Sequence, residues 1–245
     1  MQKWASGAPQ FYKSSLGVRT RRVLINVIQS MWPDFRSCFC EKSIFGYAWP
    51  FLRGEKGSAP LIFMPEYGEE TDFQKKNKEK DFQITLCTET MLPLQDRSME
   101  RILIIHWLEY SESPSKSLRE VWRVLKEEGR ILLIVPNRRS LWAQKESTPF
   151  GEANSFSLSE IETLLEEAFL TPLALQGALY MPPTSFRLLQ SFFPIVERFC
   201  KKRLEGGLGF FSGVWVIEAS KKIYAAVPEA EPSSITKIVF EGTNS

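Results

Sequence analysis

Two short apolar runs on either side of an amphipathic segment constrain this fold most strongly. Residues 101–105 and 131–135 are rich in isoleucine, leucine and valine and are too short for helices. Between them, Ser113 and Pro114 suit a helix N-cap and first helical position, and Gly129 suits a left-handed C-cap. The apolar residues at helical spacing in between are Leu118, Val121, Trp122 and Leu125. This order predicts a right-handed βαβ unit in a parallel sheet.

The remaining chain continues the alternation of strands and helices. One helix is expected at 11–31. A second should begin at the capping box formed by Ser157 and Glu160. A third is expected at 186–203, where Pro194 should break or kink it. The expected strands are 35–45, 59–64, 82–86, 101–105, 131–135, 173–176 and 213–219. The pattern predicts a three-layer α/β fold with seven mostly parallel strands and an antiparallel C-terminal hairpin. Residues 1–10 are expected to be an irregular lead-in, 11–225 the domain and 226–245 a disordered tail.

Composition excludes several classes of protein. The net charge of +2 gives no broad basic field, which argues against nucleic acid as a partner. The four cysteines form no Cys-x-x-Cys pair and there is one histidine, so no metal site is expected. No apolar run is long enough to span a membrane, and the N-terminus does not resemble a signal peptide. These features favour a cytoplasmic protein with reduced thiols.

Several motifs in the central part of the chain resemble a known family. They are residues 92–94 (LPL), 98–103 (SMERIL), 106–109 (HWLE), 118–126 (LREVWRVLK) and 129–134 (GRILLI). Their order and spacing are similar to class I, type 11 methyltransferases that use S-adenosylmethionine (SAM). The resemblance implies a Rossmann-like sheet, SAM as cofactor and a methyl acceptor, a small molecule or a protein, that the sequence does not identify.

The glycine-rich loop of that family is degenerate here. The family places an acidic residue before Gly-x-Gly-x-Gly, whereas this chain has Ile44, Gly46, Ala48 and Pro50 at the corresponding positions. A bacterial branch of the family resembles this Gly-Tyr-Ala-x-Pro loop. The resemblance therefore implies that Gly46, Tyr47 and Ala48 contact the cofactor.

Ligands of open parallel sheets bind beyond the carboxyl ends of the strands. After the second and third expected strands, Glu66 would accept hydrogen bonds from the ribose hydroxyls, and Thr88 with Glu89 would lie near the adenine. The alternative for each is an ordinary solvated loop side chain.

His106, the only histidine, follows the fourth expected strand. Its neutral imidazole could accept a substrate proton, with Glu109 orienting it, and the resemblance places His106 beside the transferred methyl group. The alternative is a structural histidine.

The loop after residue 135 carries Asn137, Arg138, Arg139 and Trp142. Arginine can grip a carboxylate or phosphate through paired hydrogen bonds, so these residues are candidates for binding the acceptor. Trp142 or Tyr47 could cover the sulfonium with an aromatic face. The alternative is a surface loop with solvated arginines.

Two functions follow from this reading. The first is a SAM-dependent methyltransferase with an unidentified acceptor, and the degenerate loop leaves cofactor binding open. The second is a catalytically inactive methyltransferase fold that acts as a binding or regulatory partner. The sequence does not reveal the oligomeric state.

Overall fold

The computed structural model describes residues 8–33, 42–45, 61–65, 83–184, 192–203 and 212–221. The expected tail 226–245 and most of the expected strand 35–45 lie outside these ranges. The expected lead-in 1–10 is wrong at its end, because helix α1 (Ala8–Lys13) begins inside it.

Seven strands of the described residues form one sheet in the order β3-β2-β1-β4-β5-β7-β6. Strands β1 to β5 pair in parallel, and β7 lies antiparallel between β5 and β6. Their bounds are β1 Lys42–Phe45, β2 Leu61–Pro65, β3 Gln83–Cys87, β4 Met99–Ile105, β5 Leu125–Pro136, β6 Leu170–Ala178 and β7 Val214–Lys221. The chain runs outward from β1 to β3 on one side and from β4 to β5 on the other. The strand order therefore reverses between β1 and β4, where ligands of such sheets bind.

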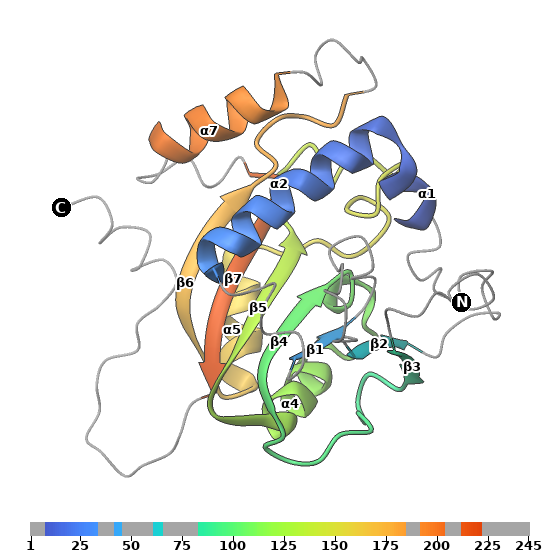
Figure 1. Ribbon diagram of the computed structural model, residues 1–245, viewed down its shortest axis with the longest axis vertical. Coiled ribbons are helices and arrows are strands. Elements are labelled where there is room, and N and C mark those ends of the chain that lie inside the picture. Colours follow the sequence, from blue (N-terminus) through green and yellow to red (C-terminus); the bar gives the residue numbers. More distant parts are fainter. Residues whose placement is uncertain are drawn as a thin grey trace.

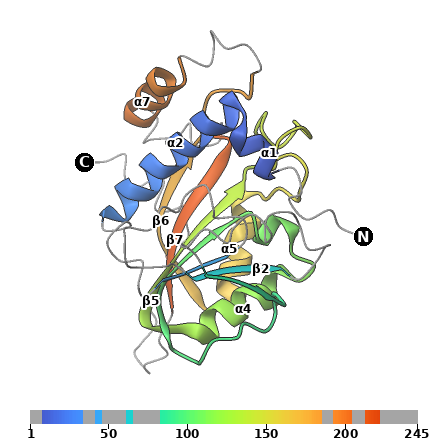
Figure 2. The same ribbon diagram turned by 45° about the vertical axis from the view of Figure 1, so that its right-hand side comes forward.

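Helices cover both faces of the sheet (Figures 1 and 2). Helix α2 (Ser15–Met31) crosses one face, where its Leu24 and Ile28 join a buried cluster with Leu103 of β4 and Leu132 of β5. Helices α4 (Pro114–Val124) and α5 (Leu158–Glu167) cover the other. Alternate strand residues point to opposite faces, so both faces need cover. The α/β layering expected from the sequence is confirmed.

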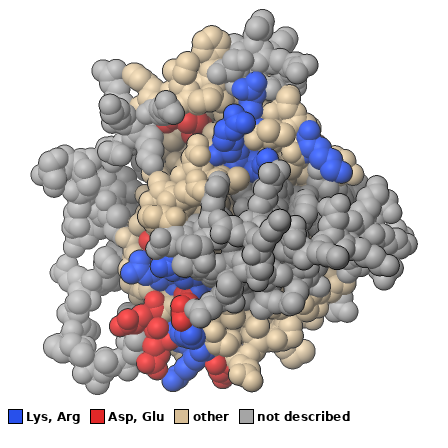
Figure 3. Space-filling model, in the orientation of Figure 1, with Lys and Arg blue, Asp and Glu red and all other residues tan. Residues whose placement is uncertain are grey.

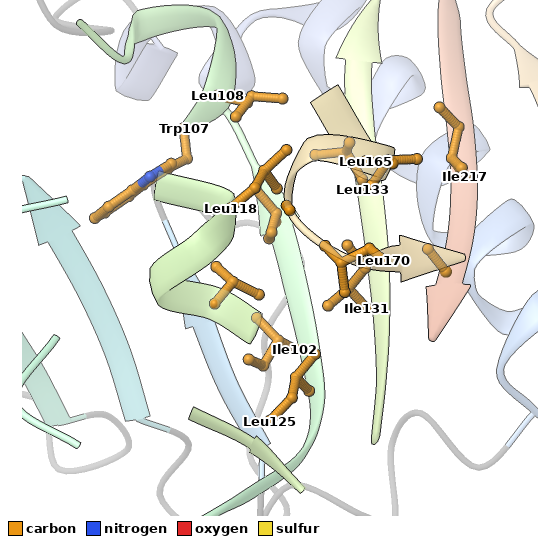
Figure 4. Packing of buried hydrophobic residues seen from close by; sticks show 14 of the residues in the cluster. Ile102, Trp107, Leu108, Leu118, Leu125, Ile131, Leu133, Leu165, Leu170 and Ile217 are labelled. Carbon is orange, nitrogen blue, oxygen red and sulfur yellow. The ribbon is translucent and has the colours of Figure 1, made fainter. Parts of the chain in front are cut away.

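The second buried cluster occupies the face under α4 and α5. Leu118 and Val121 of α4 share it with Ile102 of β4 and Ile131 of β5, and Leu165 contributes from α5 (Figure 4). The spacing of Leu118 and Val121 on one helix face, predicted from the sequence, explains this contact.

The expected C-cap at Gly129 is wrong. Helix α4 ends at Val124, and Leu125 already has an extended backbone and begins β5. The residue with positive φ is Glu128, at 60°, while Gly129 lies inside the strand. The pairing of β4 with β5 shifts register between Met99 and Arg101, which absorbs the residues after the helix as a bulge.

The capping box of α5 and the effect of Pro194 on the last helix were also predicted from the sequence. The capping box at α5 is confirmed: the Ser157 hydroxyl accepts from the Glu160 N–H, and the Glu160 carboxylate accepts from the Ser157 N–H. Helix α7 (Phe193–Arg203) starts one residue before Pro194, so this proline lies in the first turn and does not break the helix there. Residues 186–191 of the expected helix lie outside the described ranges.

The expected single helix 11–31 is divided at Ser14. The Ser14 side chain accepts a hydrogen bond from the Gly17 N–H and caps α2, so α1 becomes a separate short helix folded back on it. The short η4 helix (Leu108–Tyr110) follows β4.

We expect Gly17→Ala to lower the free energy of unfolding by about 1–3 kcal/mol. A Cβ at Gly17 would lie 1.9 Å from the backbone oxygen of Phe11, so α1 and α2 would have to separate. Denaturant unfolding measures the change, and Val18→Ala on the exposed side of α2 is the control. Equal stability of both variants would contradict this close approach.

Helix α7 is connected to the segment after β6 by a carboxylate. Glu197 accepts a hydrogen bond from the Tyr180 N–H at 2.6 Å. Burial raises the pKa of Glu197 to about 7, although interaction with the backbone of residues 179–181 acts in the opposite direction.

This raised pKa makes stability depend on pH. The unfolded carboxyl titrates near 4.5, so between there and about 7 the folded state binds this proton more strongly. The free energy of unfolding should therefore fall as pH rises through that window. Glu197→Gln should remove this decline in denaturant unfolding measured from pH 4.5 to 8, whereas exposed Glu166→Gln should retain it. An unchanged slope in the Glu197 variant would contradict the assignment.

The described surface carries charges of both signs. Figure 3 shows basic side chains over α2 and a mixed group of basic and acidic side chains near the opposite end of the sheet. Within the described ranges, no helix is both long and apolar enough to cross a bilayer.

Candidate functional site

The reversal of strand order places the site at the carboxyl ends of β1 and β4. These strands are direct neighbours, with Phe45 in register with Ile104. His106 follows immediately, with φ of 53°, a left-handed conformation that histidine adopts more readily than most residues. The turn carries the chain into η4, where Glu109 lies. Local backbone geometry therefore brings both predicted catalytic residues to the expected edge of the sheet.

Three side chains form a hydrogen-bonded row at this edge. The Tyr12 hydroxyl lies 2.7 Å from His106 Nε2, and Glu109 Oε1 lies 3.0 Å from His106 Nδ1. Tyr12 comes from α1, which lies near the carboxyl end of β5 in Figure 1. An ionised Glu109 can only accept, so it selects the imidazole tautomer with hydrogen on Nδ1. Nε2 then accepts from the Tyr12 hydroxyl.

This row is enclosed by aromatic side chains. His106 and Glu109 are each 1% exposed and Tyr12 is 5% exposed. The ring of Phe150 lies 5.0 Å from the imidazole, centroid to centroid, and packs against Trp142 at 5.5 Å. The low dielectric of such surroundings strengthens the hydrogen bonds in the row.

The second carboxylate oxygen of Glu109 differs from the first. Oε2 is buried and has no hydrogen-bond partner among the described residues. The neighbouring Tyr110 hydroxyl instead donates to the backbone oxygen of Pro149. Burial, followed by the charge of Glu109, raises the pKa of Tyr110 far above its ordinary value, so this phenol stays protonated.

The predicted adenine-binding residues have separate surroundings. Thr88 is partly buried at the end of β3 and forms an isolated bridge with Met91. The Glu89 carboxylate accepts from the Ser113 N–H at 3.2 Å and so connects this turn to the start of α4. The structure thus gives Glu89 a capping contact, and its contact with adenine stays a prediction.

Asn137 and Arg138 hold the loop after β5 to neighbouring segments. The Asn137 amide donates to the Ser212 oxygen at 2.8 Å, and its carbonyl accepts from the Arg139 N–H. Arg138 donates to the Ser155 oxygen and pairs with Glu160, lowering the pKa of Glu160 together with the Ser157 backbone hydrogen bond, which is the larger cause. These contacts direct both side chains to structural partners, so their predicted binding of the acceptor gains no support here.

Arg139 and Trp142 diverge in exposure. Arg139 is exposed, which leaves its predicted role in substrate binding open. Trp142 is 1% exposed, and its indole N–H donates to the Met181 oxygen at 2.8 Å. Its ring packs edge-on against Phe11, Phe150 and Phe193. Trp142 is thus a core residue in this structure, and the prediction that its aromatic face covers the sulfonium gains no support from these contacts.

The predicted contacts of Gly46, Tyr47, Ala48 and Glu66 lie outside the described residues. Among the residues that are described, no group of three histidine, cysteine, aspartate or glutamate side chains could hold a metal ion.

Sequence reasoning missed Tyr12. It is 94 residues away from His106 in the chain, and no local pattern links the two. The one available signal was an aromatic pair, Phe11 and Tyr12, at the start of an expected helix.

Comparisons with known proteins agree with this architecture. Residues 67–133 match a family model described as a methyltransferase domain. An uncharacterized protein of Methanocaldococcus jannaschii is 32% identical over 82 residues, which are 31% of this chain. The match spans 40% of that relative.

Solved structures resemble most of the chain. A SAM dependent methyltransferase from Aquifex aeolicus has a TM-score of 0.53 at 17% identity, covering 86% of this chain and 97% of that one. A putative S-adenosylmethionine dependent methyltransferase from Listeria monocytogenes has a TM-score of 0.54 at 13% identity, covering 83% and 99%. A possible histamine N-methyltransferase from Thermotoga maritima has a TM-score of 0.50 at 15% identity, covering 88% and 100%. At these identities the likeness shows the methyltransferase-like α/β fold.

Proposed function

We propose that this chain, in which residues 67–133 match the methyltransferase-domain family, is a SAM-dependent methyltransferase. The observation that carries the proposal is the row Tyr12–His106–Glu109 at the edge where the strand order reverses. A buried, oriented imidazole at the ligand-binding edge of this fold is suited to take a proton from a substrate.

Among the described residues, the charge of Glu109 fits the cationic groups of the cofactor. SAM carries a positively charged sulfonium and an ammonium group, and Glu109 offers a buried carboxylate oxygen without a partner among the described residues. Glu109 and Thr88, both among the described residues, would hold SAM. Further proposed contacts with the cofactor are Gly46, Tyr47, Ala48, Glu66 and Glu89. When bound, SAM supplies a methyl group already activated by its positive sulfur.

The chain's own task is then to position the acceptor and move one proton. The imidazole Nε2 is occupied by the Tyr12 hydroxyl, so the acceptor's proton passes to the Tyr12 oxygen as the phenolic proton of Tyr12 passes to Nε2. Glu109 stabilises the imidazolium that results through Nδ1. Tyr12 returns to its original state in the same step, and His106 retains the proton until solvent removes it.

This arrangement favours acceptors that must lose a proton on methylation. An alcohol or phenol loses its proton as its oxygen bonds to the methyl carbon, and the sulfur takes the electrons of the broken carbon–sulfur bond. A thioether or tertiary amine has no proton to lose and would gain nothing from the row. We therefore propose an acceptor whose nucleophilic atom carries a proton, such as a hydroxyl or phenol, on a small molecule or on a protein.

Transfer of a labelled methyl group from SAM tests the function. The protein would be incubated with SAM and a panel of phenols, hydroxy acids, thioethers and tertiary amines. Label in hydroxyl or phenol products, lost in the Tyr12→Phe variant, would support the proposal. Binding of SAM without label in any member of the panel would favour the inactive binding partner instead.

A further inference from the structure

The two oxygens of the Glu109 carboxylate have different surroundings, although the side chain is 1% exposed. Oε1 forms a hydrogen bond with His106 Nδ1 at 3.0 Å. Oε2 has no partner among the described residues, and the other two such atoms there are indole nitrogens, Trp122 Nε1 and Trp215 Nε1. Glu109 thus carries the one anionic atom in this group.

A buried carboxylate oxygen without a hydrogen bond is costly, because burial removes water and nothing replaces it. The cost is larger for an anion than for an indole N–H. The position of Glu109 is also special, since it lies three residues after His106 at the point where strand order reverses. A ligand that approaches this edge with a positively charged hydrogen-bond donor would relieve the cost.

We propose that Glu109 Oε2 accepts a hydrogen bond from the ammonium group of the cofactor's methionyl part, while Oε1 continues to orient His106. This inference rests on the proposed function, since it takes SAM as the ligand. SAM has two cationic centres, and the ammonium is the one with N–H groups to donate, whereas the sulfonium has none. A charge-assisted hydrogen bond to a buried acceptor is among the stronger contacts available to a ligand.

The assignment gives one carboxylate two tasks. Through Oε1 it fixes the imidazole tautomer, and through Oε2 it holds the end of the cofactor. Cofactor binding and orientation of the base are then coupled at one side chain. The sequence is consistent with this location, because the side chain of Ile44, two residues before the first glycine of the loop, cannot accept a hydrogen bond from an ammonium group.

Calorimetric titration of the full chain with three probes tests the proposal. S-adenosylhomocysteine (SAH) has the amino group, its deaminated analogue lacks only that group, and 5′-methylthioadenosine lacks the whole amino-acid part. Glu109→Gln should weaken SAH about tenfold or more and leave the other two probes within about twofold. Glutamine keeps an oxygen for His106 Nδ1 but presents no second acceptor, so the row itself is retained.

Two further variants keep the result interpretable. Glu109→Asp withdraws the carboxylate by one methylene and should also weaken SAH selectively, which covers the case in which the glutamine variant does not fold. Glu218→Gln is the matched control, since Glu218 is a buried carboxylate that bonds Trp32 and Arg130 away from this edge. It should leave the affinity for SAH within about twofold.

Each other outcome overturns the proposal in a recognisable way. Equal affinity of wild type and Glu109→Gln for SAH would show that the ligand donates no hydrogen bond to Oε2. Equal weakening of all three probes would show a general packing loss. If wild type binds none of the probes, the proposed function itself fails.

Discussion

Replacing His106 by asparagine is expected to lower kcat for methyl transfer by about 10²- to 10⁴-fold, the range that general bases typically contribute. Asparagine is chosen because residue 106 has φ of 53°, which asparagine tolerates, so the turn after β4 should be preserved. The side chain of asparagine cannot take up the acceptor's proton. The rate would be measured with the best acceptor found for the wild type.

The same variant should bind SAH within about threefold of the wild type, which separates loss of the base from loss of the fold. Tyr12→Phe should also lower kcat, and the double variant should be little slower than His106→Asn alone, because the two residues act in one row. A His106→Asn variant with the wild-type rate would show that the imidazole is structural.

Trp142→Ala should lower the free energy of unfolding by about 3–5 kcal/mol, the range observed when large buried aromatic side chains are truncated. The side chain is 1% exposed, packs edge-on with Phe11, Phe150 and Phe193, and donates to the Met181 oxygen. Alanine would leave a cavity between α1, the loop after β5 and α7, and the Met181 oxygen would lose its donor. Denaturant unfolding measures the effect.

Leu141 provides the control for this prediction. It precedes Trp142 in the same loop and is 55% exposed, so Leu141→Ala should change stability by no more than about 0.5 kcal/mol. A loss for Trp142→Ala as small as this would contradict the core assignment and would return Trp142 to the role of an aromatic cover over a ligand.

The alternation of elements was predictable because it follows from local patterns. The apolar spacing of Leu118 and Val121 and the capping box of Ser157 and Glu160 both specify structure within a few residues, and both were predicted correctly. Gly129 was misread because a glycine after a helix usually ends it, whereas here the pairing of Met99 with Leu125 draws the chain into the strand four residues earlier. Tertiary pairing prevailed over local propensity.

The candidate site was predictable only in part, for a related reason. His106 and Glu109 could be placed from the end of a strand, since the sheet edge is fixed by topology. Tyr12 could not, because its contact depends on how α1 folds back at Ser14 over a separation of 94 residues. Arg138 and Trp142 were predicted from residue types that suit ligand binding. In the structure their side chains instead donate hydrogen bonds to backbone oxygens of neighbouring segments.

The central claim is that the carboxyl ends of β1 and β4 receive SAM beside the Tyr12–His106–Glu109 row. A crystal structure of the protein grown with SAH tests this most directly. We expect SAH density beyond the ends of β1 and β4, with its amino group within hydrogen-bonding distance of Glu109 Oε2. Protein side chains filling that space, or SAH bound elsewhere on the molecule, would contradict it.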